Sequence, residues 1–171
     1  RILGMASSGP HSNGYSLIRK VIERSGDNLD RTITGAEGKK VPLGTALLQP
    51  TRIYVRPVLD MLRGGGIDGL AHITGGGLTE NVIRILSEDL GIEIDTGSWP
   101  RTEVFDWLQD RGGISEAEML RTFNCGIGMV MVVPPQDSER LIAESERLGV
   151  RCHDIGQVIS ANGGSRVRFV T

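Results

Sequence analysis

Residues 8 to 14 form a glycine-rich stretch, SGPHSNG, that leads directly into an amphipathic segment. Glycine lets backbone amides approach a ligand closely, and serine hydroxyls add further hydrogen-bond donors. At the start of a helix, such amides also lie at the positive end of the helix dipole, which favours an anion. The stretch therefore predicts an anion site, with these candidate ligand-binding residues: Ser8, Gly9, Ser12, Asn13 and Gly14.

His11 is the candidate catalytic residue of this stretch, because an imidazole changes its charge near neutral pH. In this interpretation it donates to a phosphate or transfers a proton. A purely structural interpretation also fits, since Ser12 and Asn13 stand where a helix N-cap is expected. The stretch lacks the spacing G-x-x-x-x-G-K-[ST] of a Walker loop, so its glycines are not assigned to ATP.

A second glycine-rich stretch, HITGGGLTEN at residues 72 to 81, lies between an apolar alternating segment and a helical one. It repeats the arrangement of strand, glycine loop and helix, which again suits a ligand. The alternative is that three glycines simply allow close packing. The candidate binding residues here are Thr74, Gly75, Gly76, Gly77 and Asn81.

A third segment, FNCGIGM at residues 123 to 129, places Asn124 just before the most apolar strand candidate. From the end of a strand, Asn124 can reach a ligand, although an ordinary turn explains the pattern too. Cys125 has no base close in sequence, so a nucleophilic role is not indicated. Cys125 and Cys152 are the chain's two cysteines, without zinc-ligand spacing, and we expect reduced core residues and no metal site.

Hydrophobic periodicity predicts the helices that position these segments. An apolar face begins at Tyr15 and the helix should end at Gly26, while Ser115 and Glu118 have capping-box spacing. The other expected helices lie within residues 57 to 63, 78 to 86, 100 to 111 and 141 to 148.

Strands are expected at residues 67 to 74 and 92 to 95, and residues 127 to 133 should form a buried central strand. Residues 150 to 159 and 166 to 170 are expected to pair as a hairpin at the sheet edge, through the turn at residues 161 to 164. Residues 27 to 50 are polar and rich in turn residues, so we expect them to form mainly a connecting segment. The predicted fold class is α/β (α+β), with one mixed sheet flanked by helices.

The bulk properties suit a single globular domain covering residues 1 to 171. Apolar residues make up 39% and charged residues 23%, which is ordinary for such a domain. A net charge of -2 argues against a nucleic-acid partner. No apolar run approaches a bilayer span, so we expect a cytoplasmic protein with no membrane partner. The chain starts at Arg1 without a methionine, which suits a fragment.

Five segments together resemble the carboxyl-terminal domain of the phosphoribosylformylglycinamidine cyclo-ligase (aminoimidazole ribonucleotide synthetase) family. The resemblance spans nearly the whole chain and rests on SGPHSNGYSLIRK, PTRIYV, AHITGGGLTENVIR, DTGSWPRTEVFDWLQ and RTFNCGIGM. It implies ring closure of formylglycinamidine ribonucleotide to aminoimidazole ribonucleotide in purine biosynthesis. ATP with Mg²⁺ activates an amide oxygen, and an internal nitrogen then attacks. The glycine-rich stretches would bind the phosphoribosyl substrate.

The resemblance also implies an amino-terminal ATP-binding domain that is absent from this chain. That domain would carry most of the ATP and Mg²⁺ chemistry and contribute strongly to a homodimer. We therefore expect no tightly bound cofactor and negligible turnover for this chain alone. The catalytic cleft would lie between the two domains.

Two alternatives remain on the sequence. The triple-glycine stretch also resembles other ATP-dependent members of the same superfamily, which act on selenide, thiamine phosphate or a hydrogenase maturation substrate. A non-catalytic module that binds a phosphate ligand is the second alternative. The substrates converted by a full-length protein distinguish the first, and binding without turnover characterises the second.

Overall fold

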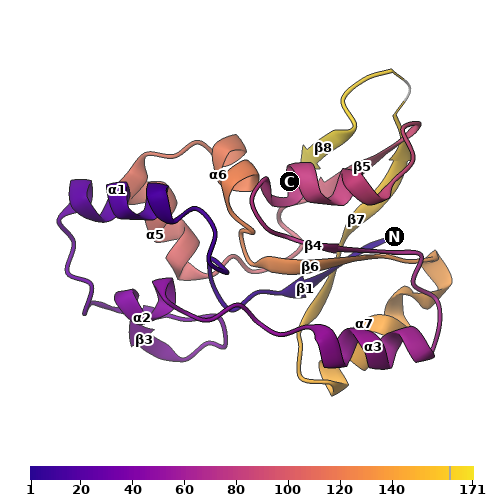
Figure 1. Cartoon of the computed structure of the whole chain (residues 1–171), viewed down its shortest axis with the longest axis horizontal. Coiled ribbons are helices and arrows are strands. Elements are labelled where there is room, and N and C mark those ends of the chain that lie inside the picture. Colours follow the sequence, from indigo (N-terminus) through magenta and orange to yellow (C-terminus); the bar gives the residue numbers. More distant parts are fainter. Residues whose placement is uncertain (162) are drawn as a thin grey trace.

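The computed structural model describes residues 1–161 and 163–171, and its centre is a six-stranded sheet with helices against both faces (Figure 1). The strand order is β4-β6-β1-β7-β5-β8. Neighbouring strands are antiparallel except β5 and β8, which are parallel, so the sheet is mixed. The strands are β1 Ile2–Ala6, β4 Gly69–His72, β5 Leu90–Asp95, β6 Ile127–Val132, β7 Cys152–Ser160 and β8 Val167–Val170. The predicted fold class is confirmed.

Strand β1 lies inside the sheet and separates two hydrophobic clusters. Its side chains alternate, so that Ile2 joins the larger cluster while Leu3 and Met5 join the smaller one. Helices α3 Val55–Arg63 and α7 Ser138–Arg147 contribute side chains to the smaller cluster. The helices of the opposite side are α1 Tyr15–Ser25, α2 Leu43–Leu47, α4 Gly77–Asn81, α5 Glu103–Gly112 and α6 Glu116–Thr122.

Several local predictions are confirmed. Helix α1 ends at Gly26 as expected, and Gly26 has the left-handed conformation that glycine adopts at low cost. The hydroxyl of Ser115 accepts a hydrogen bond from the backbone nitrogen of Glu118 at 3.3 Å and caps α6. Strand β6 lies in the sheet interior between β4 and β1, and most of its side chains are buried.

The hairpin predicted for the last two strands is wrong. Both edges of β7 are taken, by β1 on one side and by β5 on the other, so β8 instead pairs in parallel with β5. Strand β8 does lie at the sheet edge, as expected. Of the predicted turn, Asn162 lies outside the described residues.

Residues 27 to 50 contain more structure than their polar sequence indicates. A small hairpin of β2 Thr32–Thr34 and β3 Lys40–Pro42 is followed by α2. Its strands have three residues each, too few for a period-two pattern to stand out. Ile33 and the apolar side of α2 anchor this region in the larger core.

No helix within residues 1–161 and 163–171 has both the length and the apolar character needed to cross a membrane.

Candidate functional site

The three glycine-containing segments predicted as ligand loops meet at one end of the sheet. Strand β6 is antiparallel to both β1 and β4, so its beginning lies beside their ends. Ala6 pairs with Ile127 on one side, and His72 pairs with Met129 on the other. The loops that follow β1 and β4 therefore flank the turn that precedes β6.

Both glycine loops pack on the end of α6 and the turn that joins it to β6. A methyl group on Gly14 would overlap the ring of Phe123, and one on Gly77 would overlap the carbonyl oxygen of Leu120. Phe123 is fully buried. Glycine is thus required at Gly14 and Gly77 by close approach as well as by their positive φ angles of 72° and 55°.

Asn124 holds the first loop to this turn. Its side-chain nitrogen donates to the carbonyl of Gly9 at 2.8 Å. Its side-chain oxygen accepts from the Ser7 hydroxyl and from the Gly126 backbone nitrogen, both at 2.9 Å. Asn124 is almost completely buried, so in this arrangement it orders the loop from within.

Asn81 has the same role in the second loop. Its side-chain nitrogen donates to the carbonyl oxygens of Gly75 and Gly77 at 3.2 and 2.8 Å. Its oxygen lies 3.3 Å from the hydroxyl of Thr74, which donates to it. The carbonyls of Gly75 and Gly77 are thereby held by the buried Asn81 side chain, while Gly75 itself is exposed.

The first loop has a strained backbone around His11. His11 and Ser12 both adopt positive φ angles, of 54° and 60°, which cost energy for residues with a side chain. Asn13 supports this turn by donating from its side-chain nitrogen to the carbonyl of His11 at 2.8 Å. The expected side-chain cap is absent, since Gly14 is the N-cap of α1 and neither Ser12 nor Asn13 caps it.

The imidazole of His11 is buried and ties two distant segments together. Its Nε2 accepts hydrogen bonds from the backbone nitrogen of Ser8 at 3.0 Å and from that of Arg52 at 3.3 Å. Because both donors are backbone N–H groups, Nε2 must present its lone pair, which leaves the proton of the neutral ring on Nδ1. Burial, with His72 and Arg52 nearby, lowers the pKa of His11 to about 4. At neutral pH the ring is uncharged.

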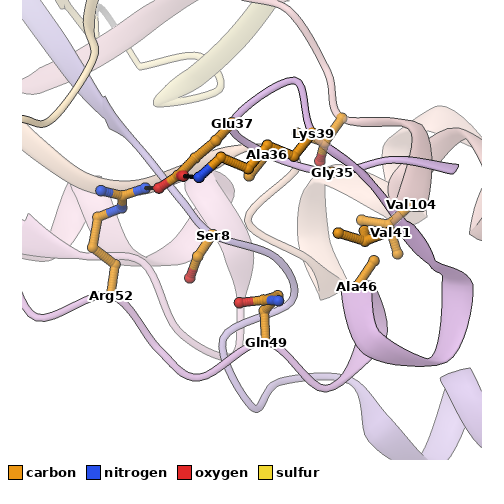
Figure 2. A pocket seen from close by; sticks show the side chains of 11 residues that line it. Ser8, Gly35, Ala36, Glu37, Lys39, Val41, Ala46, Gln49, Arg52 and Val104 are labelled. Carbon is orange, nitrogen blue, oxygen red and sulfur yellow. Dashed lines mark hydrogen bonds and ion pairs between the residues drawn. The ribbon is translucent and has the colours of Figure 1, made fainter.

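Ser8 lines a cavity of about 230 Å³ between the first loop, the β2–β3 hairpin and the segment before α3 (Figure 2). Arg52 and Lys39 contribute positive charge to this cavity, and Glu37 extends its carboxylate between them. The remaining lining residues are Gly35, Ala36, Val41, Ala46, Gln49, Thr102 and Val104. Residues 74 to 77 and Asn81 do not line this cavity.

A second cavity, of about 410 Å³, lies next to the first and shares Gly35, Ala36 and Thr102 with it. Ser7 faces this larger cavity and Ser8 the smaller one. Its other lining residues include Trp99, Arg101, Asp106, Arg151 and His153.

The cations of the smaller cavity were not singled out by the sequence. Lys39 lies in the β2–β3 hairpin, within residues 27 to 50, for which the sequence predicts mainly a connecting segment. Arg52 lies in the PTRIYV segment, whose pattern predicts only an extended chain or a turn. Lys39 and Lys40 adjoin glycine-rich residues 35 to 38, and that pattern is the one available signal. It does not indicate that Lys39 lines the same cavity as Ser8.

Cys125 is a buried free thiol at positive φ, and burial raises its pKa to about 12. Cys152 is also buried and free, so the prediction of reduced core cysteines is confirmed. Among residues 1–161 and 163–171, no three His, Cys, Asp or Glu side chains are grouped so that they could hold a metal ion.

The family model for the carboxyl-terminal domain of AIR synthase related proteins matches residues 1–168. The chain belongs to this family. A phosphoribosylformylglycinamidine cyclo-ligase from Nitrosococcus oceani is 50% identical over 171 residues, which is 99% of this chain and 46% of that protein. One from Xanthomonas oryzae pv. oryzae is 48% identical over 170 residues, 98% of this chain and 49% of that protein. The chain thus spans about half the length of the curated relatives it matches.

Solved structures show the same AIR synthase related fold at low sequence identity. An E. coli HypE structure has a TM-score of 0.66 with 19% identity, over 99% of this chain and 46% of that one. A thiamine-monophosphate kinase from Stenotrophomonas maltophilia K279a has a TM-score of 0.61 with 16% identity, over 98% and 49%. These likenesses establish the fold of the family domain.

Proposed function

We propose that this chain is the substrate-binding carboxyl-terminal half of a phosphoribosylformylglycinamidine cyclo-ligase. Such a protein closes formylglycinamidine ribonucleotide to aminoimidazole ribonucleotide in purine biosynthesis. The observation that carries the proposal is the 50% identity to a cyclo-ligase over 99% of this chain. Convergence of the predicted ligand loops at one end of the sheet supports it.

The role proposed for this half is to hold the ribonucleotide in a reactive conformation. Ring closure joins two ends of one molecule, so most of the gain comes from positioning them. Ser8 lines the smaller cavity and the backbone of the first loop is fixed by Asn124, which provides a rigid binding surface. His11 fixes Ser8 and Arg52 in place, and we propose that it positions them while a direct catalytic role remains a prediction.

We assign ATP and Mg²⁺ to the other half of a longer protein. Mg²⁺ prefers carboxylate and phosphate oxygens, and the described residues do not group into a set of metal ligands. They therefore do not fit a magnesium site made by this chain alone. When bound, ATP supplies the phosphoryl group that activates the amide oxygen.

The outer face of α3 is the surface that we propose the other half covers. Ile53 precedes the helix and is 79% exposed, and Val55, Leu59 and Leu62 follow at 61%, 51% and 41%. Their helical spacing puts Val55, Leu59 and Leu62 on one face. Together with Leu70, His72 and Met129 they border an apolar groove of about 600 Å³. An apolar face of this kind marks an interaction surface.

This surface is continuous with the candidate site. Arg52 lines both the smaller cavity and the apolar groove. Tyr54 donates from its hydroxyl to the Ala6 carbonyl at 2.8 Å and lines the groove. A domain seated on α3 would therefore also border the ligand cavity, as the proposed interdomain cleft requires. Since the relatives are about twice the length of this chain, their remaining half is the proposed occupant. A homodimer is proposed for the longer protein.

The test is substrate conversion by a purified longer protein containing this chain. With ATP and Mg²⁺, we expect it to convert formylglycinamidine ribonucleotide and to leave selenide and thiamine monophosphate unchanged. The 171-residue chain alone, assayed beside it, should give no product. Conversion of one of the other substrates, without conversion of the ribonucleotide, would overturn the proposal.

A further inference from the structure

The smaller cavity contains more cationic side chains than its own carboxylate neutralises. Lys39 and Arg52 line it, and Glu37 is the one acidic residue among its described lining residues, although the chain as a whole has a net charge of -2. The Glu37 carboxylate lies 3.1 Å from the Lys39 ammonium and 3.8 Å from the Arg52 guanidinium. Figure 2 shows this carboxylate between the two cations. An anionic group already occupies the position that an anionic ligand would take.

Two buried polar atoms at this cavity have no hydrogen-bond partner among the described residues. They are Nε of Arg52 and the hydroxyl oxygen of Thr102, and both side chains line the cavity. A buried donor without a partner is costly, and native proteins rarely keep one without a reason. Guanidinium and hydroxyl groups both donate to oxyanions, so the side chains of Arg52 and Thr102 favour an oxyanion as the ligand.

The size of the cavity is sufficient for such a ligand. Its volume of about 230 Å³ corresponds to roughly eight water molecules at ~30 Å³ each. That space accommodates a phosphate group. The larger cavity across Gly35, Ala36 and Thr102 offers about 410 Å³ for the organic part of the same molecule.

The ion pair of Glu37 with Lys39 is easily displaced, and the pair with Arg52, whose side chain is 20% exposed, is long at 3.8 Å. Glu37 and Lys39 are 59% and 77% exposed, and exposed ion pairs are weak because water and salt screen them. A phosphate dianion carries more charge than a carboxylate and has more acceptor oxygens for Arg52. It should therefore replace Glu37, which lies on the tip of the β2–β3 hairpin.

We propose that Arg52, Lys39 and Ser8 form a binding site, here called the seat, for the phosphate group of a phosphomonoester. Glu37 is then an internal competitor that the ligand displaces. This inference rests on the proposed function to the extent that the phosphomonoester is the phosphate of the ribonucleotide. The seat itself is defined by the cavity and can be tested with simple phosphates.

The experiment is calorimetric titration of the 171-residue chain with ribose 5-phosphate, inorganic phosphate and ribose. We expect both phosphates to bind, and ribose 5-phosphate to bind more tightly through the larger cavity, while ribose gives no heat. Arg52→Gln should weaken both phosphates roughly tenfold or more. Glu37→Gln should strengthen both by roughly two- to tenfold, because it removes the competing charge.

Matched controls are available on the same hairpin and on α1. Lys40→Gln removes a cation next to Lys39 whose ammonium instead contacts the Thr34 hydroxyl, and it should leave affinity unchanged. Glu23→Gln removes an exposed acid on α1 and should do the same. Arg52→Gln keeps the backbone N–H that binds His11, so the loop should stay folded, as thermal melting will verify.

Unchanged phosphate affinity in Arg52→Gln, or unchanged or weaker affinity in Glu37→Gln, would overturn the seat. If a longer protein still converts the ribonucleotide in that case, the proposed function stands without this seat. If the Arg52 and Glu37 effects appear but no ribonucleotide is converted, the seat stands and the proposed function fails.

Discussion

The backbone N–H of Arg52 donates a hydrogen bond to Nε2 of His11 at 3.3 Å, across 41 residues of sequence. This contact joins the first glycine loop to the segment that supplies Arg52, one of the two cations of the smaller cavity. It also requires that the imidazole stay neutral, because a protonated Nε2 cannot accept. His11 is thus placed to order the site, and its effects should differ from those of a proton carrier.

Replacing His11 tests the positioning role. His11→Ala removes the acceptor for two backbone donors and should weaken binding of ribose 5-phosphate, with an unfolding free energy lowered by about 1–3 kcal/mol. His11→Gln retains a side-chain acceptor and should restore much of both properties. Titration calorimetry and urea denaturation measure the two effects. Wild-type binding and stability in His11→Ala would contradict the positioning role.

Protonation of His11 should destabilise the fold. Its pKa is about 4 in the folded protein, below the ordinary value of 6.5, so the unfolded chain binds more protons between these values. Above pH 6.5 this group does not reduce the free energy of unfolding. As the pH falls from 6.5 toward 4, protonation of the unfolded chain lowers that free energy by roughly 3 kcal/mol. Burial also lowers the pKa of His153, which adds a change of the same sign.

The difference between wild type and His11→Gln isolates this effect. Urea denaturation from pH 7 to pH 4 should show a steeper loss of stability in the wild type than in the variant. Parallel curves would show that His11 does not titrate as the structure indicates.

Asn124 should matter for stability out of proportion to its size. Asn124→Ala leaves the Gly9 carbonyl and the Gly126 nitrogen without their buried partner, and should cost about 1–3 kcal/mol. Asn28→Ala is the matched control, since its side chain accepts one exposed hydrogen bond from Asp30, and it should cost within about 0.5 kcal/mol. Equal losses in the two variants, measured by urea denaturation, would contradict the role of Asn124.

Alanine substitutions at two glycines distinguish the cost of a strained backbone from the cost of a steric overlap. Gly77 and Gly113 have nearly the same φ, 55° and 58°, but a methyl group at Gly77 would overlap Leu120 and one at Gly113 meets nothing within 4 Å. Gly113→Ala should cost about 1–2 kcal/mol from the left-handed conformation alone. Gly77→Ala should cost clearly more and disturb the second loop. Thermal melting that ranks the two variants equally would refute the close packing of this loop on the end of α6.

The apolar face of α3 predicts a difference between the isolated chain and a longer protein. Leu59→Glu is on an exposed position, so it should leave the melting temperature of the 171-residue chain nearly unchanged. In the longer protein it should lower turnover or stability by placing a charge in the interface. Leu48→Glu, 72% exposed and outside this face, is the control. Equal behaviour of both variants in the longer protein would argue against the interface.

The sequence predicted those elements whose signal is local. The Ser115 N-cap, the left-handed glycine after α1 and the apolar strand β6 each depend on a few neighbouring residues. The β7–β8 hairpin was wrong because strand pairing depends on which edge is free, and β5 takes that edge of β7. Local turn residues carry no information about this competition.

The candidate site was predicted in part. The glycine loops do meet at one end of the sheet, yet Ser8 shares its cavity with Arg52 and Lys39 rather than with the second loop. The backbone of Arg52 is tied to the first loop by its hydrogen bond to His11, a residue far away in sequence, and a single sequence shows no trace of this contact. The ligand-binding roles of the predicted residues remain predictions.

The most direct test of the account is the Michaelis constant of a longer protein that carries Arg52→Gln, measured separately for each substrate. We predict that KM for formylglycinamidine ribonucleotide rises roughly tenfold, while KM for ATP and the values of the Lys40→Gln control stay at wild type. This result would place formylglycinamidine ribonucleotide, and not ATP, in this half. A raised KM for ATP with an unchanged KM for the ribonucleotide would contradict the account.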